Sequence, residues 1–399
     1  MQSEPLSTDS PGSREPSYPA AEARRSKRRV ALVSNLCPHY RKPLYELLAQ
    51  RFELECFFFA ESEEYQNPLM SSFELGRFTR VDLDRISVFG EPLLPGLARR
   101  LVRSRYDAVI MDLSGRLMVP YVYGVARVRS LPFVLWTGVW HHPTTVVHRA
   151  TRRIAESLYR RSDAILVYGD HVRRALQTAG VANDRIFTAA QSVNGTVFEV
   201  DAEVSTSREL LYVGQLEPHK GIADLLSAFA SVKDPDARLS LVGNGSLEPV
   251  VRRHASADPR VSLVGFVPQR ALPDRYATAR ALVLPSVTTD KYRECWGLVV
   301  NEAMHAGLPV LATDAVGAAA HGLVQDGVTG RVVAEQNPHA LGAAMTQLLA
   351  DDQLVSELGR QARDRVSRYT YDGMADAFEA AVEHAIRGRF GVAPTSRPS

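Results

Sequence analysis

Ala281-Leu-Val-Leu-Pro-Ser286 and Leu308-Pro-Val-Leu-Ala-Thr313 are apolar runs, and Glu294-Cys-Trp-Gly-Leu-Val-Val-Asn-Glu302 lies between them. Short apolar runs of this kind are typical of strands that are buried on both faces of a parallel sheet. The stretch therefore predicts a strand, a loop, a helix and a second strand. We expect Glu294 in the loop, the helix to open at residues 296–298, and Glu302 just over one turn inside it.

The two carboxylates flank the predicted start of this helix. The first N–H groups of a helix have no partner within it and carry a partial positive charge, which favours a bound phosphate. A carboxylate on each side of that anion site accepts hydrogen bonds from sugar hydroxyls. The unit therefore indicates a site for a nucleotide diphosphate sugar. The spacing alone also fits a surface helix with two solvated glutamates.

A second anion site is predicted in the segment that starts with Leu211-Tyr-Val-Gly214-Gln215 and ends with Lys220-Gly221. The apolar run predicts a strand, and Gly214 lets the backbone approach a ligand closely. Lys220 adds a full positive charge just before the next predicted helix. The stretch Val242-Gly243-Asn-Gly245 repeats the pattern of a strand followed by a turn, although any such turn favours glycine.

Taken together, these stretches resemble the family-4 glycosyltransferases, which are retaining enzymes with the GT-B fold and an E-x7-E motif. The resemblance extends over residues 30–388 and is carried mainly by residues 205–335. It implies an α/β protein with two doubly wound Rossmann-like domains, an interdomain cleft, and a C-terminal helix that crosses back to the first domain.

The resemblance also implies roles for individual residues. Glu294 is expected to hold hydroxyls of the transferred sugar, Lys220 to neutralise the donor diphosphate, and Glu302 to bind the ribose. Gln215 stands where relatives usually carry arginine, so that position supplies a hydrogen bond but no charge. The other expected donor contacts are Gly214, Gly297, Leu298, Val299, Gly243 and Phe266.

The resemblance is looser in the first half of the chain. Trp136-Thr-Gly-Val-Trp140-His141-His142 follows a predicted strand at the expected cleft, where many relatives place a histidine against the donor sugar. The register leaves open whether His141 or His142 takes that place, and simple aromatic packing is the alternative. Tyr40, in the first strand-to-helix loop, is a further expected contact with the sugar or the acceptor.

Strands alternate with helices in both halves, which predicts parallel sheets covered on both faces. The expected strands are 29–34, 54–59, 108–111, 133–136, 164–167, 209–213, 238–242, 261–264 and 281–284. The expected domains are a disordered leader (1–28), an N-terminal acceptor-side domain (29–200), a C-terminal domain that binds the nucleotide sugar (205–370), a crossover helix (371–388) and a tail (389–399).

Composition limits the function classes. No apolar run approaches the ~20 residues that span a bilayer, and a net charge of +2 argues against nucleic acid as a partner. Three widely spaced cysteines favour a reducing cytoplasm. Asp82-Leu-Asp84 and Asp234-Pro-Asp236 match an Asp-x-Asp metal clamp, but neither follows an apolar strand. We therefore expect no metal and no cofactor.

Charge is unevenly distributed along the chain. Residues 1–200 carry 27 Lys and Arg against 21 Asp and Glu, whereas residues 201–399 carry 20 against 24. Arg99-Arg100-Leu-Val-Arg103-Ser-Arg105 is one of the basic clusters, and such clusters attract anionic lipid by about 1 kcal/mol per charge close to the surface. We expect peripheral contact with an anionic membrane at the inner face, with an ordinary solvated basic surface as the alternative.

The reaction implied by the resemblance is transfer of a sugar, most simply a hexose, from a nucleotide diphosphate sugar to a hydroxyl of a glycan or lipid-linked acceptor. Cell-envelope polysaccharide or glycolipid synthesis is the expected setting. Two alternatives stay open, namely a sugar-nucleotide epimerase of the same fold and a non-catalytic protein that binds nucleotide sugars.

Overall fold

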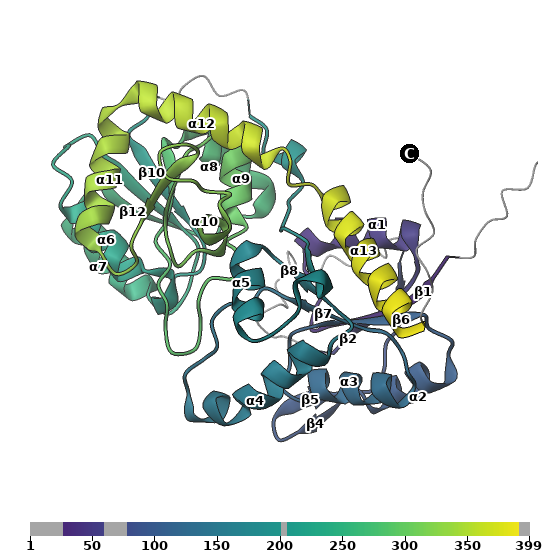
Figure 1. The fold of residues 1–399 in the computed structure, drawn as a ribbon. Helices are drawn as coiled ribbons and strands as arrows, with labels where there is room; N and C mark the ends of the chain where they lie inside the picture. The colour runs from purple at the N-terminus through teal and green to yellow at the C-terminus, as the bar shows by residue number, and fades with distance from the viewer. Residues whose placement is uncertain (1–26, 60–77, 201–205, 391–399) are drawn as a thin grey trace, which may run out of the picture.

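The computed structural model describes residues 27–59, 78–200 and 206–390, without the side chains of 146–150 and 390. Two parallel α/β sheets form two lobes that meet near residue 200, as Figure 1 shows. The predicted fold class is therefore confirmed. Most of the expected leader and tail, and residues 201–205 at the expected domain boundary, lie outside the described residues.

The first sheet has seven parallel strands in the order β3-β2-β1-β6-β7-β8-β9. Side chains of β1 alternate between two cores, with Val30 and Leu32 toward α1 and Ala31 and Val33 toward α2 and α3. The elements of this lobe are β1 (Arg29–Ser34), η1 (His39–Arg41), α1 (Lys42–Arg51), β2 (Glu53–Phe58), β3 (Thr79–Arg80), β4 (Ile86–Val88), β5 (Glu91–Leu93), α2 (Pro95–Arg103), β6 (Ala108–Asp112), α3 (Met118–Val128), β7 (Phe133–Thr137), α4 (Val146–Arg161), β8 (Ala164–Val167), α5 (Asp170–Thr178), η3 (Asn183–Arg185), β9 (Ile186–Thr188) and η4 (Gly195–Val197).

The second sheet has six parallel strands in the order β12-β11-β10-β13-β14-β15. Its strands are short and apolar because both faces are covered by helices. The elements are β10 (Glu209–Val213), η5 (Pro218–Lys220), α6 (Ile222–Ala230), β11 (Arg238–Val242), α7 (Glu248–Ala257), β12 (Val261–Gly265), η6 (Gln269–Ala271), α8 (Leu272–Thr278), β13 (Ala281–Leu284), α9 (Val299–His305), β14 (Val310–Thr313), α10 (Gly317–His321), β15 (Gly330–Val333), α11 (Pro338–Ala350) and α12 (Asp352–Val366).

The last helix, α13 (Tyr371–Phe390), returns to the first lobe, where Figure 1 shows it in yellow beside α1. Phe378 is fully buried and packs edge-on against Trp136 of β7, with ring centroids 4.9 Å apart. On the opposite side, Arg51 of α1 forms ion pairs with Asp376 at 2.6 Å and Glu379 at 3.1 Å. The predicted crossover helix is therefore confirmed.

Helix α9 begins later than predicted. Gly297 adopts a left-handed φ of +90°, and the Trp296 carbonyl accepts a hydrogen bond from Ala318 N–H, so neither residue is helical. The helix starts at Val299, and Glu302 lies within its first turn. The prediction that residues 296–298 open the helix was wrong, because a left-handed residue ends the preceding loop rather than starting a helix.

Candidate functional site

The carboxyl ends of β10, β11 and β12 meet in three glycine turns. Gly214 N–H donates to the Val242 carbonyl at 3.0 Å, and Gly243 N–H donates to the Gly265 carbonyl at 2.8 Å. A Cβ on Gly243 would lie 1.8 Å from the Gly214 carbonyl oxygen, so no other residue fits there. Close packing of the backbone therefore requires glycine in the turn after β11. Because all three turns contain glycine, backbone peptide groups rather than side chains are presented at this edge of the sheet.

An ion pair between Lys220 and Glu294 lies beside these turns. The Lys220 ammonium, at the end of η5, contacts Glu294 Oε2, and both side chains are largely buried. The Glu294 carboxylate also accepts hydrogen bonds from Tyr292 Oη at 3.1 Å and Ser286 Oγ at 3.3 Å. The two residues predicted to carry the chemistry therefore form one site, although they are far apart in the sequence.

The electrostatics of this pair follow from its burial. Burial raises the pKa of Glu294, but the charge and hydrogen bond of Lys220 outweigh it, and the pKa lies below its ordinary value. Burial and the neighbouring Lys220 lower the pKa of His219, whose ring packs against Tyr292 at 4.5 Å. The site at neutral pH thus contains an ionised carboxylate and a neutral imidazole.

Glu302 has a different environment. It is 7% exposed, and its Oε2 accepts a hydrogen bond from Tyr276 Oη at 2.8 Å. Burial raises the pKa of Glu302 to about 7, although hydrogen bonds from Tyr276 and Gln269 oppose the rise. Within the described residues, no lysine or arginine pairs with this carboxylate as Lys220 pairs with Glu294, so burial keeps the pKa of Glu302 close to neutral pH.

The other predicted donor contacts lie on the same side of the second sheet. Gln215 follows Gly214 and is exposed, while its carbonyl accepts a hydrogen bond from Tyr212 Oη at 2.6 Å. Phe266 follows β12 and is 49% exposed. Leu298 is the N-cap of α9 and Val299 its first residue, and the first N–H groups of a helix have no partner within it.

Contacts from the first domain reach the Glu294 loop directly. Trp140 Nε1 donates to the Glu294 carbonyl at 3.0 Å, and the Arg293 guanidinium lies 3.8 Å from the centre of a Trp140 ring. His171 Nε2 is 3.1 Å from the Cys295 carbonyl. The loop after β7, through Trp140, and α5, through His171, therefore pack against the Glu294 loop.

The two adjacent histidines of that loop have different surroundings. His142 stacks on Tyr159 of the first domain, with ring centroids 5.8 Å apart. His141 lines a cavity together with Thr288 and Thr289 of the second domain. His141 rather than His142 therefore faces the space between the domains.

Tyr40 lies in η1, and its carbonyl accepts a hydrogen bond from Tyr371 Oη at 2.7 Å.

A half-buried polar cluster at the carboxyl edge of the first sheet was not predicted. The Arg41 guanidinium lies 3.8 Å from the centre of a Trp136 ring and donates to Tyr168 Oη. Burial raises the pKa of Asp112, which accepts a hydrogen bond from Ser34 Oγ at 3.0 Å. The available signals were the charged loop before α1 and an aspartate that ends an apolar strand.

Neither Asp-x-Asp pair lies at this site. Asp82 is exposed and pairs with Arg80 at 2.6 Å. Asp234 pairs with Arg208 at 3.0 Å in the turn before β11, at the amino-terminal edge of the second sheet. Among the residues that the structure describes, no group of three or more His, Cys, Asp and Glu side chains is arranged to hold a metal ion.

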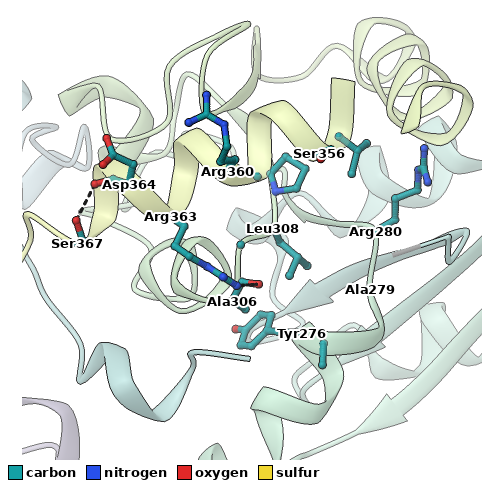
Figure 2. Close-up of a pocket in the computed structure, with 15 residues that line it drawn as sticks. Tyr276, Ala279, Arg280, Ala306, Leu308, Ser356, Arg360, Arg363, Asp364 and Ser367 are labelled. Atoms are coloured by element: carbon teal, nitrogen blue, oxygen red, sulfur yellow. Dashed lines mark hydrogen bonds between the residues drawn. The ribbon is translucent and has the colours of Figure 1, made fainter. Parts of the chain in front are cut away.

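A cavity of about 560 Å³ lies on the other side of the second domain, between α12 and the turns before β13 and β14 (Figure 2). Arg363 crosses it and donates to the Ala306 carbonyl at 3.0 Å, while Ser367 donates to the Asp364 carbonyl. None of the predicted site residues lines this cavity. It is therefore separate from the Lys220–Glu294 site.

Apolar helices long enough to cross a bilayer are absent from the described parts of the chain.

Solved structures show the fold. HepE from Anabaena, in complex with UDP and glucose, matches with a TM-score of 0.70 at 17% identity, over 88% of this chain and 98% of that chain. At this identity the match shows the fold alone, and that fold is GT-B.

The sequence comparisons match part of the chain to a family. Residues 195–365 match the model described as "Glycosyl transferases group 1", so this part of the chain is similar to the family of glycosyltransferases that the sequence resembles. Similar curated proteins include an alpha-D-kanosaminyltransferase of Streptomyces kanamyceticus, 26% identical over 267 residues, and a D-inositol 3-phosphate glycosyltransferase 2 of Catenulispora acidiphila, 32% identical over 271 residues. Each match covers 61% of this chain, which spans 67% and 60% of those relatives.

Proposed function

We propose that the chain is a retaining glycosyltransferase that transfers a hexose from a nucleotide diphosphate sugar to a hydroxyl of a glycan or lipid-linked acceptor. The observation that carries the proposal is the buried ion pair of Lys220 and Glu294. Two loops at the carboxyl edge of one parallel sheet bring these residues together beside the start of α9, and ligands of such sheets bind at that edge.

Lys220 would stabilise the charge that grows on the departing diphosphate. Preorganised donors aimed at developing charge are commonly the largest catalytic contribution available to an enzyme. The N–H groups of Leu298 and Val299 would support Lys220, and the exposed amide of Gln215 would add a hydrogen bond without charge. Glu294 would hold hydroxyls of the transferred sugar. In such a mechanism the donor phosphate accepts the proton of the attacking hydroxyl, so no enzymatic nucleophile is required.

Glu302 would bind the ribose. Its carboxylate has lone pairs beyond the one used by Tyr276, and two ribose hydroxyls are suitable donors. The glycine turns at Gly214 and Gly243, together with Phe266, would then face the nucleotide.

We further propose cytoplasmic cell-envelope polysaccharide or glycolipid synthesis with peripheral contact to an anionic membrane. Arg99, Arg103 and Arg105 are exposed on or just after α2, whereas Arg100 binds Glu55 at 3.0 Å and is engaged in the fold. Phe89, at the tip of the β4–β5 hairpin that leads into α2, is 97% exposed. Exposed cations and an exposed aromatic ring are groups that suit a lipid headgroup surface.

Turnover of UDP, GDP, ADP and dTDP sugars, followed by NMR with and without membrane lipid extract, tests the proposal. We expect acceptor-dependent transfer with retained anomeric configuration, and equal rates with and without EDTA because protein groups neutralise the diphosphate. Epimerised free sugar without acceptor would indicate an epimerase, and binding without turnover would indicate a non-catalytic protein. Loss of activity in EDTA that Mn²⁺ or Mg²⁺ restores would contradict the expected metal independence.

A further inference from the structure

A second cavity, of about 650 Å³, lies between the two domains next to the Glu294 loop. The first domain contributes residues from the loop after β7, and the second contributes residues from the loops after β13 and β15. The lining residues are His141, Thr144, Thr288, Thr289, Asp290, Glu335 and Gln336. All of them are polar, and the volume falls within the ~300–1,000 Å³ of small-ligand pockets.

Two features of this lining raise the free energy of the folded protein, namely an unpaired polar atom and a strained backbone. His141 Nε2 is buried and has no hydrogen-bond partner in the described structure, and a buried polar atom without a partner costs about 1–3 kcal/mol. Gln336 adopts a left-handed φ of +57°, which is unfavourable for a residue with a side chain. Strained backbone and unsatisfied polar atoms concentrate at ligand sites.

The other polar groups of the cavity are already oriented. Glu335 Oε1 accepts a hydrogen bond from Thr288 Oγ1 at 2.8 Å, and Asp290 Oδ1 accepts one from Thr144 Oγ1 at 2.9 Å. The Asp290 carbonyl also accepts from Thr144 N–H at 2.8 Å, which joins the two domains across the cavity. The carboxylates and hydroxyls therefore stand in fixed positions before any ligand arrives.

The chemistry of the lining selects a class of ligand. Carboxylate oxygens, hydroxyls and an imidazole nitrogen can bind hydroxyl or ammonium groups, whereas no lysine or arginine is among the described lining residues. Arg293 lies next to the cavity, but it pairs with Glu335 at 3.7 Å. A phosphate or carboxylate in the cavity would therefore face two carboxylates without a lining cation, which is unfavourable.

The cavity is connected to the proposed transfer site through Trp140. This residue precedes His141, stacks with Arg293 and donates to the Glu294 carbonyl. We infer that the cavity is an acceptor subsite for a carbohydrate or cyclitol ring that carries hydroxyl or ammonium groups and no phosphate, with His141, Asp290 and Glu335 as its main contacts. This inference rests on the proposed function, since it names the acceptor class of the same site.

The test is a set of titrations by calorimetry or saturation-transfer NMR with and without saturating nucleotide diphosphate. The probes are methyl glucoside and myo-inositol as neutral polyols, glucosamine as the ammonium form, and glucose 6-phosphate as the anion. We expect a neutral or amino probe to bind and glucose 6-phosphate to bind at least tenfold more weakly. His141→Ala should weaken the bound probe at least fivefold, and His142→Ala, the matched control that stacks on Tyr159, should not.

Three outcomes would overturn the inference: no neutral or amino probe binds, glucose 6-phosphate binds more tightly than they do, or both histidine variants weaken binding equally. Nucleotide binding and donor turnover, measured on the same samples, separate the two proposals. If those persist while the probes fail, only the acceptor subsite is wrong. If they are absent from the folded wild-type protein, the proposed function fails.

Discussion

Lys220 and Glu294 neutralise each other's charge, but the pair contributes little to the stability of the folded protein. Removing two charges from water costs several kcal/mol for each ion, so a buried pair contributes little net stability. Removing one partner is different, because the remaining charge stays buried without compensation. This asymmetry predicts distinct behaviour for single and double variants.

Lys220→Ala should reduce turnover by about 2–4 kcal/mol of transition-state stabilisation and should also destabilise the fold, because Glu294 loses its cation. Lys220→Met combined with Glu294→Gln removes both charges, so this double variant should recover most of the stability but not the activity. Urea unfolding and turnover per folded molecule measure the two effects. Full activity in the folded fraction of Lys220→Ala would make Lys220 a structural residue.

The raised pKa of Glu302 predicts that the stability of the folded protein depends on pH. Its folded pKa is about 7 against an ordinary 4.5, so between these values the folded protein holds a proton that the unfolded chain has released. Stability from this group therefore falls as pH rises through that window, by up to about 3 kcal/mol. Glu302→Gln removes the charge and should stabilise the protein more at pH 8 than at pH 5, while weakening nucleotide binding. An equal effect at both pH values would contradict this account.

At the scale of elements, the crossover helix α13 packs into the core of the first domain. Phe378→Ala should cost about 3–5 kcal/mol because the ring is fully buried against Trp136. Arg51→Ala is the matched control on the same helix contact, where the carboxylate partners are largely exposed, and should cost about 1 kcal/mol or less. Denaturant unfolding of both variants measures the difference, and similar costs would show that α13 does not pack as a core element.

Periodicity and apolar runs predicted most elements, because strands such as β1, β10 and β13 are short and buried on both faces. The start of α9 could not be predicted, since the Trp296 carbonyl, next to the left-handed Gly297, accepts a hydrogen bond from Ala318 of α10, which only the folded sheet brings close. Of the site, the sequence predicted that Glu294 and Lys220 act together. It did not predict their direct contact or the contacts of Arg41 with Trp136 and Tyr168, because both arise from loops that only the folded sheets bring together.

At the scale of the whole molecule, the excess of positive charge in residues 1–200 predicts salt-sensitive attraction to anionic surfaces. Replacing Arg99, Arg103 and Arg105 by glutamine should abolish flotation with anionic vesicles at low salt. Deleting residues 1–28 should have a smaller effect. The control replaces the exposed second-domain residues Arg252, Arg360 and Arg368, and it should float as the wild type does. No flotation of the wild type at low salt would remove the membrane from the proposal.

The most direct test of the Lys220–Glu294 site is thermal stabilisation by a panel of UDP, GDP, ADP and dTDP sugars. A ligand that binds only the folded state stabilises it by about 2.7 kcal/mol at a hundredfold excess over Kd. We predict that at least one donor raises the melting temperature of the wild type and that the folded Lys220→Met/Glu294→Gln variant loses most of this rise. No rise with any donor, or an equal rise in the double variant, would contradict the assignment of this ion pair to the nucleotide-sugar site.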